Sequence, residues 1–156
     1  MTMPLVRRAN KADVPLIVAF NAAMAEETEG LSLDPIVLQR GVEEIFRNPQ
    51  HGFYIVCEID NVVHACLMIT YEWSDWRNGQ FWWIQSVYVQ KEFRQQGLYK
   101  QMYEFIKTEV KKSKGIAGIR LYVDHNNDKA KEVYKKSGMK KSNYELFEYI
   151  RPGNTG

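Results

Sequence analysis

One turn of the chain joins a strand-like run to a helical pattern through a glycine, an arrangement that can hold phosphate. The alternating run Val87–Val89 leads into the turn Arg94–Gly97, and a helical pattern begins at Leu98. A helix N-terminus has free backbone N–H groups and partial positive charge, and a glycine lets the backbone come close to an anion. A plain turn explains the same residues, because neither a Rossmann glycine pattern nor a P-loop lysine is present.

A second pattern lies downstream, in the segment NNDKAKEVYKKSGM. Positions i, i+3, i+7 and i+11 are occupied by Asn127, Ala130, Tyr134 and Gly138. The first three share a helical face, and the glycine is suited to end the helix. Together, Arg-x-x-Gly and Asn-x-x-Ala-x-x-x-Tyr-x-x-x-Gly-Met resemble the motifs of the GNAT superfamily of acetyl-CoA-dependent N-acetyltransferases. The order of elements from Val6 to Tyr149 is similar to that family.

The resemblance implies where the acetyl-CoA donor binds. The strand Val87–Val89 would splay from a parallel neighbour and pair with the pantetheine arm, while residues 94–99 would wrap the pyrophosphate. The implied donor-binding residues are Val87, Tyr88, Val89, Arg94, Gln95, Gln96, Gly97, Leu98, Tyr99, Asn127 and Tyr134. Tyr99 departs from the family, in which many members have glycine or alanine at this position.

Acetyl transfer from a thioester to an amine needs a neutral amine, donors for the carbonyl oxygen and a proton for the departing thiolate. By the resemblance, a backbone N–H near Val87 polarises the carbonyl, and Tyr134 lies near the sulfur. A tyrosine, with an ordinary pKa of about 10, can protonate a thiolate and stay neutral at pH 7. Half-buried packing on a helix face is the alternative for Tyr134.

The acceptor amine must also lose a proton, since an alkyl ammonium has a pKa of about 10. Glu72 is the leading candidate for the base, because it lies where one expected strand ends beside the next, close to the expected carbonyl. Asp75 is the next candidate, and Glu26 or Glu29 could close over the same cleft. A solvated carboxylate without a catalytic role is the alternative.

The acceptor is expected to be a small amine, of cationic character, or a peptide. The acidic segment AEETEG and Asp34 lie where similar enzymes border the acceptor. The expected aromatic residues on the other side are Trp73, Trp76, Trp82 and Trp83. Carboxylates and aromatic faces suit a cation, although a solvated loop and a tryptophan-filled core explain them as well. A sensor that binds acetyl-CoA without turnover is the second hypothesis.

The elements that must position these residues follow from periodicity and turn signals. Expected helices begin at the Asn10–Asp13 capping box, at Pro35 after the N-cap Asp34, after Gly97 and after Asn127. Expected strands are 5–7, 53–59, 62–70, 80–89, 119–123 and 143–150. The resemblance and these elements predict an α/β (α+β) fold of GNAT type. Its mixed, mostly antiparallel sheet of about six or seven strands has a central parallel splayed pair and about four flanking helices.

The two cysteines, Cys57 and Cys66, lie in strands joined by the two-residue turn Asp60-Asn61. In the simplest register Cys57 faces His64 and Cys66 faces Ile55. The thiols would then share a face about 7 to 8 Å apart, too far for an unstrained disulfide. We therefore expect reduced thiols and no metal site.

The composition predicts one domain, 1–156, with a short tail at 151–156. The chain has 156 residues, of which 45% are hydrophobic, and its net charge of +2 does not favour nucleic acid or an anionic membrane as partner. No apolar run approaches the roughly 18 residues of a membrane span, so we expect a cytoplasmic protein. The lysine clusters are expected to be solvated helix ends or a contact for a 3′-phosphate. The apolar segments FWWIQSVYV and YELFEYI suit a homodimer edge or a buried core.

Overall fold

A computed structural model describes residues 2–153 of the chain. Backbone contacts divide the chain into two compact units, Met1–Leu121 and Tyr122–Gly156. The first unit contains a five-stranded sheet, and the second contains the helix that carries the downstream motif. The prediction of a single domain over 1–156 stays a prediction. Of the predicted tail 151–156, residues 154–156 lie outside the described residues.

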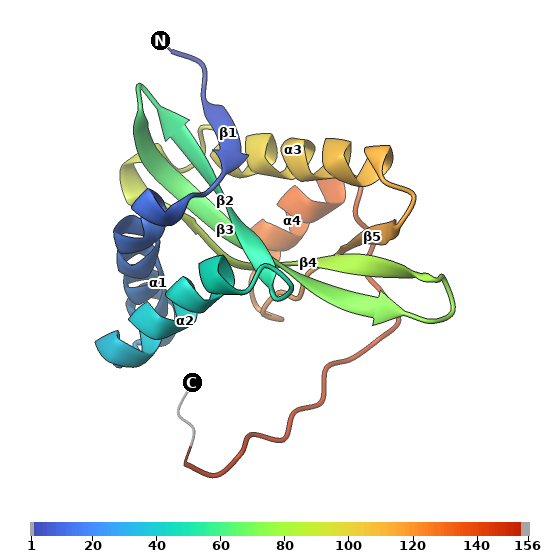
Figure 1. The fold of residues 1–156 in the computed structure, drawn as a ribbon. Helices are drawn as coiled ribbons and strands as arrows, with labels where there is room; N and C mark the ends of the chain where they lie inside the picture. The colour runs from blue at the N-terminus through green and yellow to red at the C-terminus, as the bar shows by residue number, and fades with distance from the viewer. Residues whose placement is uncertain (1, 154–156) are drawn as a thin grey trace. The chain divides into compact units, whose positions relative to one another are not determined.

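The strands of the sheet follow one another in sequence order, from β1 to β5 (Figure 1). They are β1 (Leu5–Arg8), β2 (Gly52–Ile59), β3 (Val62–Ser74), β4 (Gly79–Val89) and β5 (Ile116–Arg120). Neighbouring strands are antiparallel except β4 and β5, which are parallel. The predicted mixed sheet with one parallel pair is confirmed. Within residues 2–153 the sheet has five strands instead of six or seven.

The α-helices begin at the signals that the sequence predicts. The helices are η1 (Lys11–Asp13), α1 (Val14–Glu29), α2 (Pro35–Arg47), η2 (Lys91–Phe93), α3 (Leu98–Lys112) and α4 (Asp128–Lys136). The Asn10–Asp13 capping box forms and caps η1, the short turn that leads into α1. The Asp34 side chain accepts hydrogen bonds from the N–H groups of Ile36 and Val37, which fixes the start of α2.

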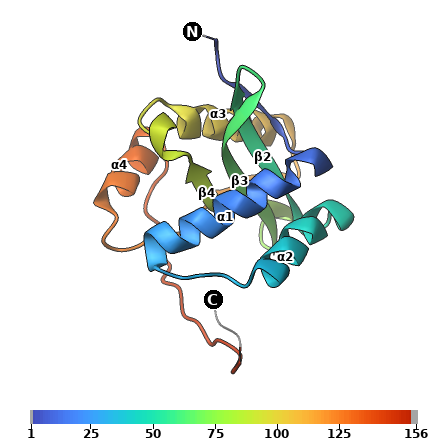
Figure 2. The ribbon, with the colours of Figure 1, turned by 90° about the vertical axis from the view of Figure 1, so that its left-hand side faces the viewer.

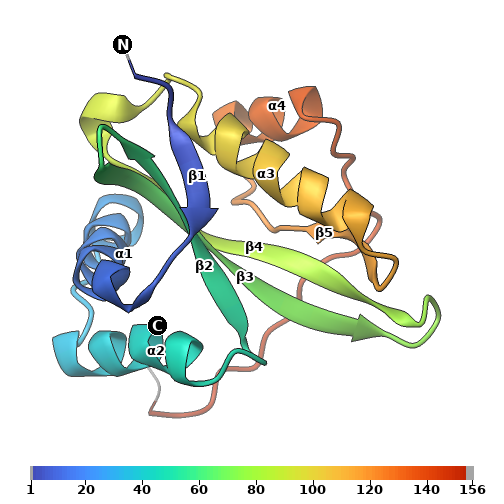
Figure 3. The ribbon, with the colours of Figure 1, turned by 45° about the horizontal axis from the view of Figure 1, so that its top comes forward.

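The sheet of the first unit lies between two helical layers. Figures 2 and 3 show α1 and α2 on one side of the sheet and α3 on the other. The buried cluster under α1 and α2 contains Val14, Ile17, Phe20, Val42, Tyr54, Val56, Val63 and Cys66. Ile55, Leu67 and Ile69 alternate with these strand residues and are fully buried as well. Because successive strand side chains point to opposite faces, the apolar runs of β2 and β3 serve both layers.

The β2–β3 hairpin has the predicted turn, but the predicted register is wrong. The turn residues Asp60-Asn61 have φ of 52° and 67°, as a tight hairpin requires. A bulge next to Cys57 then shifts the pairing, so that Cys57 pairs with Ala65 and Cys66 with Val56. The extra residue places the two cysteines on opposite faces of the sheet. Both are free and buried, and burial raises the pKa of Cys57 to about 11 and that of Cys66 to about 12.

Two predicted strands are corrected by the structure. The strand predicted at 119–123 begins earlier, at Ile116, where Gly118 allows close packing because a Cβ there would lie 3.1 Å from the Phe81 ring. Residues 143–150 form no strand, and their side chains include Tyr144 and Phe147, which are 74% and 90% exposed. Alternation shows which side chains would share a face, but a strand forms only where its backbone groups find a partner.

Candidate functional site

The second half of β4 has an open edge. On the β3 side, pairing continues to Val89, whereas on the β5 side it is confined to Gln80–Trp83. The pairing stops at Trp83 because β5 ends at Arg120, its partner; Figure 3 shows β5 beside only part of the longer β4. This is the predicted parallel pair, although within the described residues β5 lies at the edge of the sheet and not at its centre. Backbone groups of residues 84–88 that face away from β3 lie outside the strand ladder and can pair with an extended ligand.

A β-bulge interrupts this open half. Leu67 of β3 opposes two residues of β4, Ser86 and Val87. Ser86 has a φ of 52°, in the left-handed region that non-glycine residues rarely adopt. A bulge bends its strand and takes a residue out of regular pairing, often beside a functional site. The backbone donor predicted near Val87 lies at this bulge, and no sequence signal predicted the bulge itself.

The turn between β4 and α3 presents the N-terminus of α3. Gln95 and Gly97 have φ of 64° and 82°. Gly97 is the N-cap of α3 and has no side-chain oxygen for the first-turn N–H groups, and the space around its α-carbon is open. The amides of residues 98–100 precede the first intrahelical hydrogen bond of α3. An anionic group is therefore suited to this end of the helix.

The Arg94 side chain links this turn to helix α1. Its Nε donates to the Val89 carbonyl at 2.8 Å, and its Nη2 donates to Oε2 of Glu27 at 2.7 Å. The Tyr88 hydroxyl donates to Oε1 of Glu27 at 3.1 Å. Glu27 was not predicted as a site residue. Its helical position, seven residues after the buried Phe20, is the signal that could have found it.

Tyr99 lies in the first turn of α3. Its ring stacks on that of Tyr103, with centroids 6.2 Å apart and an interplanar angle of 24°. Tyr103 lies one helical turn further and is buried. The ring of Tyr99 thus follows the helix, and the space beside Gly97 stays open. The effect of Tyr99 on donor binding stays a prediction.

Glu72 lies in β3, opposite Phe81 in the paired half of β4. Its Oε1 accepts from Nε1 of Trp83 at 3.0 Å and from Nη1 of Arg120 at 2.8 Å. These bonds, that of Trp83 first, hold the pKa of Glu72 below its ordinary value. Arg120 was not predicted, because it joins Glu72 only through the register in which it pairs with Trp83. Both donors bond the same oxygen, Oε1.

The other predicted bases take different positions. Asp75 is exposed in the turn that joins β3 to β4. Glu26 and Glu29 are exposed on α1. Glu27, between them, is the acidic residue of the segment AEETEG that contacts β4 and the turn before α3. The part that Asp75, Glu26 or Glu29 plays as a base stays a prediction.

The four tryptophans do not form one cluster. Trp82 is 6% exposed, and its ring lies 5.1 Å from that of Phe53. Trp83, the next residue, points to the opposite face and donates to Glu72. Trp73 and Trp76 are 61% and 87% exposed. The prediction that all four tryptophans lie together on one side of the acceptor site is wrong, because neighbouring strand residues such as Trp82 and Trp83 alternate between faces.

The second unit carries the downstream motif as a helix. The Asn127 side chain accepts from the Ala130 N–H at 3.1 Å and caps α4. Gly138, with a φ of 95°, follows its last turn. Burial raises the pKa of Tyr134. The helix is confirmed, whereas the roles of Asn127 and Tyr134 toward a donor stay predictions.

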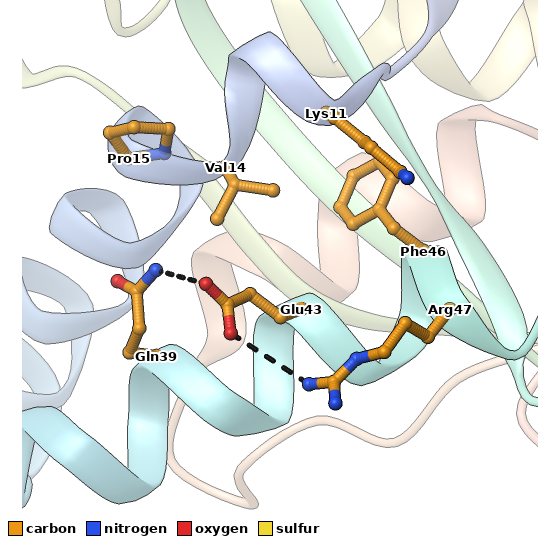
Figure 4. Close-up of a pocket in the computed structure, with 7 residues that line it drawn as sticks. All are labelled: Lys11, Val14, Pro15, Gln39, Glu43, Phe46 and Arg47. Atoms are coloured by element: carbon orange, nitrogen blue, oxygen red, sulfur yellow. Dashed lines mark hydrogen bonds and ion pairs between the residues drawn. The ribbon is translucent and has the colours of Figure 1, made fainter.

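A pocket of about 360 Å³ lies between the start of α1 and helix α2 (Figure 4). It is lined by Lys11, Val14, Pro15, Gln39, Glu43, Phe46 and Arg47. Its carboxylate, Glu43, already accepts from Gln39 at 2.7 Å and pairs with Arg47 at 3.7 Å. No predicted site residue lines this pocket, and we assign it no part in the site.

The first unit offers two features that fit a donor with a diphosphate and an amide-bearing arm. The N-terminus of α3 offers amide groups to phosphate, and the open edge of β4 offers backbone groups to the arm. Within the described residues no three His, Cys, Asp or Glu side chains are grouped to hold a metal ion. None of the helices in residues 2–153 has the length and apolar character needed to cross a bilayer.

Comparisons with known proteins extend this picture. The model of the acetyltransferase (GNAT) family matches residues 19–139. Among solved structures, a possible acetyltransferase from Clostridium difficile 630 is 42% identical, with a TM-score of 0.89 over 96% of this chain and 98% of that chain. A search of curated proteins gave no match.

Two more distant structures contain ligands related to the donor. A predicted acetyltransferase from Clostridium acetobutylicum with acetyl-CoA is 21% identical, with a TM-score of 0.75 and coverage of 94% and 96%. AAC(6')-Iy in complex with the bisubstrate analogue CoA-S-monomethyl-acetylneamine is 15% identical, with a TM-score of 0.77 and coverage of 96% and 99%. These two show a shared fold. From the family match and the 42% identical structure, the chain belongs to the GNAT acetyltransferase family.

Proposed function

We propose that the protein transfers the acetyl group of acetyl-CoA to a primary amine of a small cationic acceptor. The family uses acetyl-CoA. The observation that carries the proposal is the open half of β4, which contains a bulge and leads through one turn to the bare N-terminus of α3. An extended donor with a diphosphate at one end needs these two features side by side.

In this proposal the chain provides donor binding through its backbone. Acetyl-CoA supplies the activated acetyl thioester. The turn Arg94–Gly97 and the amides that follow hold the diphosphate, and Val87–Val89 align the arm. Leu98 is 2% exposed, so its contribution comes from its amide and not from its side chain. Tyr99 and Asn127 complete the proposed set, and the N–H at the bulge polarises the carbonyl.

The proton transfers are assigned to two side chains. Tyr134 is the proposed acid, and its raised pKa keeps the hydroxyl protonated at neutral pH. Glu72 is the proposed base, and its lowered pKa keeps the carboxylate ionised in the same range. In this proposal Oε2 attracts the protonated amine and takes up its proton, directly or through water. Arg120 holds the carboxylate in place from the other oxygen.

The function is tested by measuring thiol release from acetyl-CoA across polyamines, amino acids, aminoglycosides and peptides. We expect release with a small cationic amine and little with neutral or acidic peptides. Calorimetry with acetyl-CoA alone gives the donor affinity in parallel. Donor binding without thiol release for any acceptor class would favour a sensor, and absence of donor binding would refute both readings.

A further inference from the structure

Glu27 connects three elements of the first unit. It lies on α1 and accepts from the Tyr88 hydroxyl of β4 and from the Arg94 guanidinium of the turn before α3. Arg94 is also bonded to the Val89 carbonyl, and its guanidinium lies 5.5 Å from the centroid of the Tyr88 ring. The Tyr88 ring in turn lies 5.1 Å from that of Phe20 on α1. The contacts form a closed network around one carboxylate.

The two oxygens of Glu27 are both engaged, one by Tyr88 and one by Arg94. This differs from Glu72, whose two donors share Oε1. A carboxylate with both oxygens bonded to the protein is suited to holding other groups in place and not to exchanging protons with a substrate. The bonds to Arg94 and Tyr88 also lower the pKa of Glu27, so it stays ionised at neutral pH.

The network acts on the residue that begins the phosphate turn. Arg94 has an extended backbone, and Gln95 and Gly97 after it have positive φ. A turn with such a backbone has several alternatives in solution, and ordering it costs conformational entropy. An isolated exposed ion pair contributes little, but here Arg94 is bonded at Nε and at Nη2 to two different elements. These bonds fix where the turn starts.

We propose that Glu27 is a positioning residue for the donor: through Arg94 and Tyr88 it holds the turn Arg94–Gly97 in the conformation that presents the α3 amides to a diphosphate. The inference rests on the proposed function, since it takes acetyl-CoA as the donor. It goes beyond that function by assigning donor affinity to a carboxylate on α1. Binding is stronger when a site is already ordered, because less entropy is lost.

The direction in which acetyl-CoA affinity changes when Glu27 is replaced distinguishes this positioning role from a simple effect of charge. A carboxylate near a diphosphate site opposes binding by its charge, so its removal should strengthen binding if charge alone matters. Loss of the positioning role should weaken binding instead. We expect Glu27→Gln to raise the dissociation constant of acetyl-CoA about fivefold, measured by calorimetry on the full chain.

Glu43→Gln is the matched control. Glu43 also pairs with an arginine, and its side chain is 43% exposed against 41% for Glu27. The charge change is the same, and Glu43 lies in the pocket to which we assign no part in the site. We expect its dissociation constant for acetyl-CoA to equal that of the wild type. An unchanged or tighter constant for Glu27→Gln would overturn the proposal.

A double-mutant cycle tests whether Glu27 acts through Arg94. In an Arg94→Met background only the bond from Tyr88 to Glu27 remains, so Glu27→Gln should weaken acetyl-CoA binding by no more than about twofold, less than its fivefold effect in the wild type. A full fivefold loss in that background would mean that Glu27 acts independently of Arg94, and would overturn the proposal. Tyr88→Phe is the second variant, for the case in which Glu27→Gln does not fold. It removes one hydrogen bond to the same carboxylate, so we expect acetyl-CoA to bind about twofold more weakly. An unchanged affinity would overturn the proposal. A wild-type chain that does not bind acetyl-CoA would sink the proposed function together with this inference.

Discussion

The two halves of β4 differ in how many neighbours their backbone has. The first half, Gly79–Trp83, is paired with β3 on one side and, from Gln80 on, with β5 on the other. The second half, Ile84–Val89, is paired with β3 alone and contains the bulge. One strand is thus rigidly held at one end and open at the other. The difference arises because β5 has only five residues and ends at Arg120, which pairs with Trp83.

A carboxylate contacts each half of β4, and the two carboxylates differ in how many of their oxygens are bonded. In the paired half, Glu72 is bonded by Arg120 and Trp83 at one oxygen. In the open half, Glu27 is bonded by Arg94 and Tyr88 at both oxygens. An arginine and an aromatic side chain thus bond one oxygen of Glu72 but both oxygens of Glu27. The comparison predicts that chemistry depends on the first and donor affinity on the second.

The largest effect is expected at Tyr134, which lies on neither half of β4. Tyr134→Phe removes the hydroxyl and should lower turnover at least about a hundredfold, because a general acid contributes this much. The dissociation constant of acetyl-CoA should stay near that of the wild type. Thiol release and calorimetry measure the two quantities. An unchanged turnover would mean that another group protonates the thiolate.

The next largest effect is expected at Glu72. Glu72→Gln should lower turnover at neutral pH by about a hundredfold. The loss should shrink as the pH approaches about 10, because the acceptor amine then loses its proton to solvent. The lowered pKa of Glu72 means that its own protonation does not shape the profile near neutral pH in the wild type. The full pH–rate profile of both proteins measures this.

Arg120 provides the control for that experiment. If Glu72→Gln acts only by breaking the ion pair with Arg120, the double variant Glu72→Gln/Arg120→Met should regain much of the lost rate. If Glu72 is the base, the double variant should stay as slow as the single one. A pH–rate profile of the same shape in wild type and variant would place the base elsewhere and weaken the contrast between the two carboxylates.

A smaller effect is expected at the open end of β4. Gly97→Ala places a methyl group in the turn at a φ of 82°, which L-residues tolerate at a cost of about 1 to 2 kcal/mol. The strain and the added bulk should weaken acetyl-CoA binding about tenfold, since a well-made anion contact is worth this much. Gly30→Ala is the control, because Gly30 also has a positive φ, 63°, and open space. Equal affinities in the two variants would contradict a special role for Gly97.

The smallest functional effect is expected at the paired end. At Gly118 a Cβ would lie 3.1 Å from the Phe81 ring, and the Arg120 guanidinium lies 3.6 Å from the ring centroid. Gly118→Ala should therefore lower the free energy of unfolding by about 1 kcal/mol, as overpacking does. Donor affinity should not change. Denaturant unfolding and calorimetry test this, and a loss of affinity as large as that of Gly97→Ala would erase the difference between the two halves.

Local chemistry explains which features the sequence predicted. The cap of Asp34, the turn Asp60-Asn61, the N-terminus at Gly97 and the cap of Asn127 each depend on neighbouring residues, and each forms as expected. The parallel pair followed from short links between strand, helix and strand. Features that depend on register were missed, because a one-residue bulge beside Cys57 changes every pairing beyond it.

The residues of the candidate site fall into the same two groups: those placed by neighbouring residues and those placed by contacts between elements. The sequence by itself determined the turn Arg94–Gly97 and the helix of Tyr134, because spacing along one helix or turn fixes which groups lie together. Only the tertiary structure decided that Glu27, and not Glu26 or Glu29, meets Arg94. The same holds for the pairing of Glu72 with a distant arginine. Contacts between elements depend on helix rotation and strand register, which the packed core sets and local patterns do not record.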